Sequence, residues 1–340
     1  MKSLIFLTLL VISLSLSAQK KEDQWTVIFY NVENLFDTLD NPETIDEEFT
    51  PGSEKTWNTK RYEKKLDDIA RVLTSVNTTE LPEIIGLCEV ENEHVLRDLA
   101  ATDAFKKSSY GIVHFDSPDA RGIDAALLYR RDEFTVTDQK ALPVIFPFDS
   151  TDTTRDILYV KGQTRDKETL HFFVNHWSSR RDGQKETEPK RIIAAVTLRK
   201  EIDMLLTREP EAKLVIMGDF NDEPTNNSIF GMLMANNKKK NASGRDLYNL
   251  MYDMHNEENK GSYNYRGNWN MLDQIIISQP LLSSNSGYTT EHDGGKIFRA
   301  DWMMYNDENR GPVPSRTYGG PNYYGGVSDH LPVYVILTKK

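Results

Sequence analysis

Two short polar motifs in the last third of the chain carry the side chains best suited to chemistry. Asp219 and Asn221 lie in a Gly-Asp-Phe-Asn tetrapeptide at the end of an apolar run, and Asp329 and His330 precede another apolar run near the C-terminus. Carboxylate, amide and imidazole groups can hold a cation, activate water and bind a phosphate. Asp and Asn are also ordinary turn residues after a strand, so either motif alone has a plain structural explanation.

Two upstream segments place oxygen ligands in the same kind of position. Asn31 follows the first apolar run after residue 25, and Glu89 comes near the end of another. A carboxylate on a rigid strand end, with an amide oxygen nearby, is the donor set that Mg²⁺ prefers. The four strand ends together therefore predict a magnesium site, with Glu89 as its principal ligand and Asn31 beside it.

The order of these motifs resembles the endonuclease/exonuclease/phosphatase superfamily, which has the fold of pancreatic-type deoxyribonuclease. The resemblance is to a secreted, bacterial-type member and covers residues 25 to 337. Its six motifs contain, in order, Asn31, Glu89, Asn175 with His176, Asp219 with Asn221, Asp273, and Asp329 with His330. It implies an α/β (α+β) fold, a four-layer sandwich of two packed mixed β-sheets flanked by helices. It also implies a Mg²⁺-dependent phosphoric ester hydrolase, with Mn²⁺ as the alternative ion.

The resemblance also implies roles for the polar residues. Asp219 and Asn221 would polarise the attacking water and hold a phosphoryl oxygen, and their spacing of two puts both side chains on one face of an extended backbone. Asp329 becomes a ligand or positioner of the metal-bound phosphate. His330 becomes the general base, with its ring oriented by Asp273.

A second imidazole separates the subclasses of this superfamily. Abasic-site endonucleases generally lack the histidine that corresponds to His176, whereas deoxyribonuclease-like nucleases, sphingomyelinases and many phosphatases keep it. We expect Asp124 to orient His176, and we assign His176 as the general acid opposite His330. The sequence leaves the reverse division of these two tasks open.

Arginines beside the motifs are candidates for binding the phosphate. A guanidinium matches the geometry of a phosphate, so Arg121 and Arg180 are expected to touch substrate together with Asn175. Arginine in a surface loop is also ordinary, and this remains the alternative. Aromatic residues crowd the late loops and could stack on bases or fill the underside of the insertion at 280–327. These aromatic residues are Trp269, Trp302, Tyr318, Tyr323 and Tyr324.

The elements that must position these residues follow from the apolar runs. Short runs rich in Val, Ile and Phe, bounded by turn residues, predict strands buried on both faces. They lie at 26–30, 83–87, 111–115, 125–129, 171–174, 214–217, 274–277 and 333–337. Apolar residues recur at helical spacing over 66–76 and 192–206, which predicts two long amphipathic helices that cover the sheets. The mixture favours a layered α/β domain over an all-β one.

Composition limits the organisation and location of the protein. Lys2, the apolar run at 4–16 and the small residues before position 19 are typical of a signal peptide at 1–18, followed by one domain at 19–340. The run is short for a membrane span, so we expect a released, secreted or periplasmic protein without a stable membrane anchor. Cys88 is the single cysteine, so there is no internal disulfide.

The net charge of −11 argues mildly against a broad cationic face for nucleic acid. It does not exclude a nuclease, because the metal and a few arginines set the charge at the phosphate. The first hypothesis is thus a secreted nuclease of low sequence specificity, with DNA or RNA as substrate and no protein partner inferred. The second is a phosphatase or phospholipase C-like enzyme acting on phosphoinositide or sphingomyelin. The third is a binding module that has lost catalysis.

Overall fold

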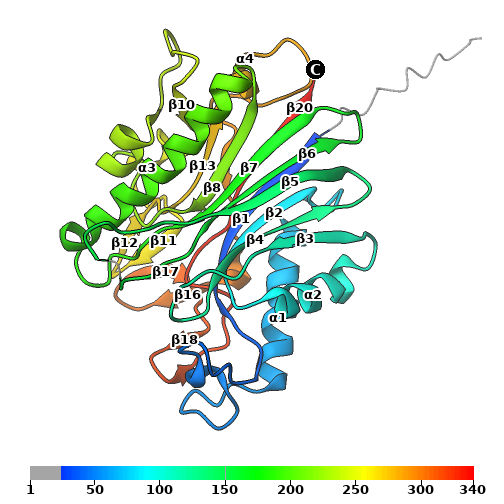
Figure 1. Ribbon diagram of the computed structural model, residues 1–340. Coiled ribbons are helices and arrows are strands. Elements are labelled where there is room, and N and C mark those ends of the chain that lie inside the picture. The colour runs from blue at the N-terminus through cyan, green and yellow to red at the C-terminus, as the bar shows by residue number, and fades with distance from the viewer. Residues whose placement is uncertain (1–23, 150) are drawn as a thin grey trace, which may run out of the picture.

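The computed structural model describes residues 24–149 and 151–340 (Figure 1). The expected signal peptide at 1–18 lies outside these residues. The described chain forms two large β-sheets, three small two-stranded sheets and a few helices. Among its helices, none combines the length and the apolar character that crossing a membrane requires.

The first sheet has seven strands in the order β14-β20-β1-β2-β4-β3, with β15 paired to β20. Its strands are β1 (Gln24–Leu35), β2 (Ile84–Val90), β3 (Tyr110–His114), β4 (Asp124–Arg130), β14 (Tyr288–Thr289), β15 (Gly295–Ile297) and β20 (Val333–Lys339). Only β1 and β2 run parallel among these described strands, and the other pairs are antiparallel.

The second sheet also has seven strands, in the order β5-β6-β7-β8-β13-β10-β9. Its strands are β5 (Phe134–Leu142), β6 (Ile157–Thr164), β7 (Thr169–His176), β8 (Lys213–Asp219), β9 (Ala235–Asn236), β10 (Leu247–Asn249) and β13 (Asp273–Ser278). The central pair β7 and β8 is parallel, so both strands end at the same edge of the sheet. The neighbouring β13 is antiparallel and begins where β8 ends.

Helices cover the outer face of each sheet (Figure 1). One apolar cluster joins α1 (Thr59–Ser75) and α2 (Glu93–Ala101) to the first sheet, and another joins α3 (Gln184–Arg208) to the second. A third apolar cluster fills the space between the sheets and contains Val27, Phe29, Cys88, Val174 and Met217. The expected four-layer sandwich of two mixed sheets flanked by helices is therefore confirmed. The short helix α4 (Pro280–Ser283) follows β13.

Smaller elements build the loops around one end of the sandwich. Three hairpins pair β11 (Tyr263–Tyr265) with β12 (Asn268–Asn270), β16 (Met304–Asp307) with β17 (Gly311–Pro314), and β18 (Tyr318–Gly319) with β19 (Asn322–Tyr323). Short helical turns lie at Glu47–Phe49, Asp103–Phe105, Asn227–Met232, Met254–Asn256 and Asp301–Met303.

All eight predicted strands lie in β1, β2, β3, β4, β7, β8, β13 and β20, and the two predicted helices lie in α1 and α3. In the two large sheets, the sequence analysis missed the longer strands β5 and β6 and the short strands β9, β10, β14 and β15. Strand β5 is an edge strand with several exposed polar side chains, so it lacks the continuous apolar run of a strand buried on both faces. The lone Cys88 is fully buried between the sheets, where desolvation raises the pKa of its thiol well above the ordinary value.

Candidate active site

The polar strand ends of both sheets meet at one edge of the sandwich. In β8, Val215 and Met217 face the core between the sheets, so the alternation of a strand puts Asp219 on that same inner face. The same alternation turns Asp273 inward at the start of β13, directly opposite Asp219 in the strand pairing. Two buried carboxylates from neighbouring strands thus lie at the centre of the site.

Asp219 lies among groups from both sheets. Its Oδ2 accepts a 3.1 Å hydrogen bond from the side-chain amide of Asn31 in β1, and it lies 3.8 Å from His176 Nε2 and 3.9 Å from His330 Nε2. Its Oδ1 accepts a hydrogen bond from the backbone N–H of Asn221, which has a φ of 51°. The backbone N–H of Asn221 therefore holds Oδ1 in place, and Oδ2 lies near both imidazoles.

His330 is oriented as the sequence led us to expect. Its Nδ1 lies 2.7 Å from Asp273 Oδ2, so its Nε2 is directed towards Asp219. The ring of Tyr263 packs on that of His330 with centroids 4.7 Å apart, and the hydroxyl of Ser328 accepts a hydrogen bond from the His330 backbone N–H. The pair of His330 and Asp273 is confirmed as a structural unit.

His176 enters the site from β7 without an acidic partner for its second nitrogen. Its Nε2 lies 3.7 Å from Glu89 Oε1, whereas its buried Nδ1 has no hydrogen-bond partner among the described residues. Arg155, which the sequence analysis missed, donates hydrogen bonds to the backbone carbonyls of His176 and Trp177 and pairs with the buried Asp119. Arg155 therefore holds the backbone of His176 and Trp177 in position.

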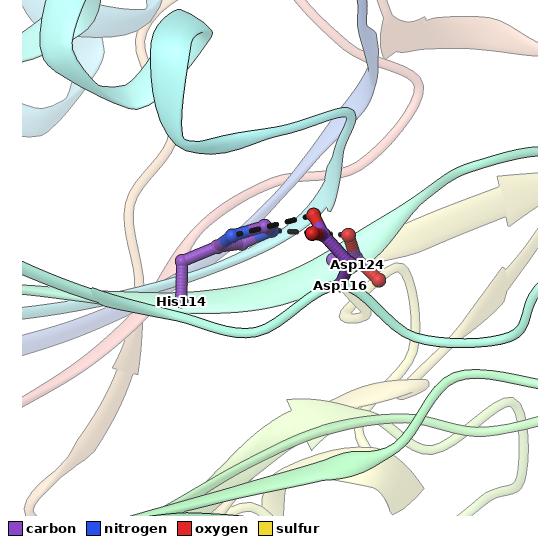
Figure 2. Close-up of side chains that lie close together, drawn as sticks. All are labelled: His114, Asp116 and Asp124. Atoms are coloured by element: carbon purple, nitrogen blue, oxygen red, sulfur yellow. Dashed lines mark hydrogen bonds and ion pairs between the residues drawn. The ribbon is translucent and has the colours of Figure 1, made fainter.

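The prediction that Asp124 orients His176 is wrong. Asp124 Oδ2 lies 3.0 Å from His114 Nε2, and Asp124 Oδ1 accepts the backbone N–H of Ser117. Figure 2 shows Asp124 and Asp116 together beside the ring of His114, and each contacts a ring nitrogen. Ala125 and Leu127 of β4 face the core between the sheets, so the neighbouring Asp124 points to the opposite face of the sheet.

Glu89 reaches the site through a break in strand alternation. Cys88 packs in the core between the sheets, so in a regular strand the next residue, Glu89, would point to the helical face. Val90 instead occupies the helical face, which shows that the alternation is broken at Glu89. Glu89 has a φ of 61°, and the pairing of β2 with β4 shifts register between Cys88 and Val90. This bulge turns the carboxylate inward, where Oε2 accepts the N–H of Asn34 and Oε1 lies 3.4 Å from the amide of Asn31.

Asn175 does not belong to the site, so its predicted contact with phosphate is wrong. It is adjacent to His176 in β7 and therefore points to the other face, where it is fully buried. Its amide donates to the carbonyl of Met217 and its oxygen accepts from the indole of Trp177. Asn175 links β7 to β8 behind the site.

The two predicted arginines have different environments. Arg180 donates to the carbonyl of Asn221 and contacts Asp222 and Asn226, so its guanidinium holds the loop after β8. Arg121 is half exposed, and its positive charge acts on both Glu89 and His176. Contact of either side chain with substrate stays a prediction.

Asp329 lies at the exposed margin of the site. Its Oδ2 accepts a 2.9 Å ion-paired hydrogen bond from Arg316, a residue that the sequence analysis did not identify. The buried Lys65 of α1 holds the adjoining loops, because its ammonium donates to the carbonyls of Glu33 and Val327 and to the hydroxyl of Thr317. No local motif marks Arg316 or Lys65, since their partners lie far away in the chain.

The electrostatics distinguish the two histidines. Burial would lower the pKa of His330, but the charge and hydrogen bond of Asp273, with the charges of Asp219 and Asp329, raise it well above the ordinary value. Burial lowers the pKa of His176 well below the ordinary value, and the positive charges of Arg155 and Arg121 add to this effect. At neutral pH these shifts favour a charged His330 and a neutral His176.

The donor set fits a divalent cation with hard ligands. Glu89 Oε1 and Asp219 Oδ2 lie 3.7 and 3.8 Å from His176 Nε2, and both contact the side-chain amide of Asn31, so two carboxylates meet at one point. Carboxylate oxygens of Asp219 and Asp273 also lie within 4.8 Å of a nitrogen of His330. The Oδ1 atom of Asp273 is buried with no hydrogen-bond partner among the described residues. Burial, followed by the charge of neighbouring acids, raises the pKa of Glu89 despite the opposing charge of Arg121. A cation would offset this concentration of buried negative charge, and oxygen-rich sites suit Mg²⁺ or Mn²⁺.

Comparison with known families agrees with this geometry. Residues 26–339 match the model of the endonuclease/exonuclease/phosphatase family. The chain belongs to this family. The members are generally phosphoester hydrolases that depend on a divalent metal, and the match includes both sheets and every strand end of the site.

Solved structures of family members show the same fold at low sequence identity. A family protein from Bacteroides thetaiotaomicron shares 17% identity with a TM-score of 0.58, and the alignment covers 94% of this chain and 96% of that one. A mannosyl-6-phosphatase from the same organism has 17% identity, a TM-score of 0.57 and coverage of 92% and 99%. The human nocturnin catalytic domain has 15% identity, a TM-score of 0.54 and coverage of 93% and 95%. No curated protein matches the chain in sequence.

Proposed function

We propose that the protein is a secreted, Mg²⁺-dependent phosphodiester hydrolase, and specifically a nuclease of low sequence specificity. The observation that carries the proposal is the convergence of Asp219, His330 with Asp273, His176 and Glu89 on one point from two sheets. Acids alone could serve a structural cation, but two imidazoles that face one carboxylate also provide for proton transfer.

We assign each residue of the site a role in hydrolysis. Glu89 would hold the cation, with Asn31 and Asp329 beside it, and a bound Mg²⁺ would neutralise charge on the phosphate oxygens. Asp219 and Asn221 would orient the attacking water. The neutral His176 is suited to accept a proton, and the charged His330 is suited to donate a hydrogen bond to the phosphate or the leaving oxygen. This reverses the division that we assigned from sequence, in which His330 was the base.

The first test is cleavage of supercoiled plasmid and of a labelled oligonucleotide, with Mg²⁺, with Mn²⁺ and with a chelator. We expect metal-dependent cleavage that His330→Ala abolishes. The control is His94→Ala, since His94 is exposed on α2 and lies outside the site. If no nucleic acid is cleaved, the nuclease proposal falls.

Phosphomonoesters and phospholipid head groups are the second substrate class in the same assay. One protein of this fold is described as a mannosyl-6-phosphatase, which makes a sugar phosphate a direct comparison substrate. Release of phosphate or head group from these substrates, with intact nucleic acid, would assign a phosphatase or phospholipase C-like activity instead. No hydrolysis of any substrate, together with no Mg²⁺ binding by calorimetry, would indicate the inactive binding module.

The secreted location is tested separately. We expect residues 1–18 to be removed and the mature protein to appear in the periplasm or the medium. Sequencing of the N-terminus of the protein from each cell fraction checks this, and an intact N-terminus in the cytoplasmic fraction would contradict it.

A further inference from the structure

A cleft of about 710 Å³ opens beside the candidate active site. Its walls come from the hairpins β11/β12 and β16/β17 and from the loop before β20. Asp329 and its partner Arg316 line it, as does Tyr263, whose ring packs on His330. The cleft therefore begins at the catalytic histidine and extends outward from the phosphate position.

Exposed aromatic rings line this cleft. Tyr265 is 53% exposed, Tyr305 59% and Tyr324 63%, so none of the three contributes much to the core. By contrast Tyr318, from the same region, is buried against Trp57. Exposed phenol rings in a polar cleft provide flat surfaces on which nucleobases stack. Of the two explanations open for the late aromatics, base stacking thus fits the rings of the cleft, and core filling fits Tyr318.

Positive charge accompanies the rings. Arg266 and Arg310 both line the cleft, and across residues 24–149 and 151–340 neither side chain forms an ion pair. Arg266 lies over the ring of Tyr265, 5.1 Å from its centroid. The one carboxylate nearby besides Asp329 is Asp307, whose Oδ1 accepts backbone N–H groups of Asn309 and Arg310. The cleft is thus lined by three arginines, Arg266, Arg310 and Arg316, and two acids, Asp307 and Asp329, and this excess of positive charge in a protein of net charge −11 suits an anionic ligand.

The size of the cleft limits what can occupy it. Pockets of ~300–1,000 Å³ enclose ligands of small-molecule size. One or two unpaired nucleotides are of this size, whereas a duplex presents its bases stacked inside and cannot place them against the tyrosines.

We propose that this cleft binds one or two unpaired nucleotides next to the scissile phosphate, which makes single-stranded nucleic acid the substrate. The inference rests on the proposed phosphodiesterase function and extends it. Tyr265, Tyr305 and Tyr324 stack on the bases, and Arg266 and Arg310 contact the flanking phosphates. The occupied cleft then places the scissile phosphate between His330 and Glu89.

The test compares hydrolysis of a single-stranded oligonucleotide, of the same strand in a duplex, and of methyl p-nitrophenyl phosphate, which occupies little beyond the reacting phosphate. The variants are Tyr265→Ala/Tyr324→Ala and Arg266→Ala/Arg310→Ala. Phe148→Ala and Arg208→Ala are matched controls, because both residues are exposed and lie outside the cleft. Thermal unfolding checks that each variant is folded.

We expect the wild type to cleave the single strand at least 10-fold faster than the duplex. Each cleft variant should lose at least 10-fold in kcat/KM on the single strand, mainly through KM, and keep its rate on the small diester. Equal loss on both substrates, no loss on either, or equal rates on single strand and duplex would overturn the proposal.

Binding of a labelled hexathymidylate, measured by fluorescence anisotropy with Mg²⁺, separates this inference from the proposed function. If nothing is hydrolysed but the wild type binds the oligonucleotide and the cleft variants do not, the cleft assignment stands and the nuclease function fails. If the wild type also fails to bind, both are wrong.

Discussion

At the scale of single residues, the contact between Asp273 and His330 determines the charge of the site. The two side chains are 2.7 Å apart and both are buried, so the carboxylate stabilises the imidazolium strongly. The same contact fixes which ring nitrogen faces Asp219. The position of one proton in the site therefore depends on Asp273.

Asp273→Asn should lower the rate of phosphodiester hydrolysis by about 10² to 10⁴-fold, because the amide keeps the shape but no longer stabilises a charged His330. Steady-state kinetics on the small diester measure this loss. Asp124→Asn is the matched control, since Asp124 pairs with His114 away from the site and should retain activity within about threefold. A large loss in Asp124→Asn with a normal Asp273→Asn would contradict this geometry.

Arg155→Met should destabilise the fold by about 3–5 kcal/mol, because it leaves the buried Asp119 without its partner. The carbonyls of His176 and Trp177 would lose their donor as well. Urea unfolding measures the change. The double variant Arg155→Met/Asp119→Leu should recover part of the loss, and additive losses would show that the ion pair is unimportant.

At the scale of elements, strand β7 connects two different environments. Its last residue, His176, faces the active site, while His171 near its start lies on the face covered by α3. His171 is almost fully buried, its Nδ1 lies 2.9 Å from the hydroxyl of Tyr159, and its Nε2 lies 3.4 Å from Glu209. Burial lowers the pKa of His171 to about 4.

This shift makes stability depend on pH in one direction. His171 is protonated near pH 6.5 in the unfolded chain and only near pH 4 in the folded chain. The contribution of the neutral, buried His171 to the free energy of unfolding is therefore complete above pH 6.5 and is lost as the pH falls to 4. The free energy of unfolding should fall by up to about 3 kcal/mol from this group across that window. The variant His171→Phe should show a shallower decline in urea unfolding between pH 6.5 and 4, and an unchanged slope would refute the assignment.

At the scale of the whole molecule, the packing of two sheets concentrates acidic groups from distant parts of the chain. Glu89 comes from the first sheet, and Asp219 and Asp273 come from the second. Asp219 and Asp273 are fully buried, and the side chain of Glu89 is only 15% exposed. Binding of a divalent cation should therefore stabilise the folded molecule as well as activate it.

Addition of Mg²⁺ at about 100 times its Kd should raise the free energy of unfolding by about 2.7 kcal/mol, which corresponds to an increase in Tm of roughly 5 °C. Thermal unfolding with Mg²⁺ and with chelator measures the shift. Glu89→Gln should lose most of it. Asp116→Asn is the control, because Asp116 belongs to the separate cluster with His114 and Asp124 (Figure 2), and equal loss in both variants would place the binding elsewhere.

Local patterns in the sequence were enough to predict the strands that carry the site. The apolar runs that end at Asp219 and follow Asp273 are buried on both faces, and the run that follows His330 is fully buried on one face. Hydrophobicity is a property of the run itself. A polar residue at the end of such a run is visible without knowledge of its neighbours. These runs predict a layered α/β domain with polar residues at its strand ends, whereas the two-sheet sandwich and the pair of His330 with Asp273 were implied by the resemblance to the superfamily.

Tertiary structure alone decided where strand alternation breaks and which distant partner each side chain meets. The bulge at Glu89 turns a side chain inward that regular alternation leaves without an inward position, whereas alternation turns Asn175 away from the site. Arg155 and Arg316 contact the site through loops whose position depends on packing between distant segments. Backbone dihedral angles and loop placement are set by the assembled sheets, and a single position in the sequence does not contain that information.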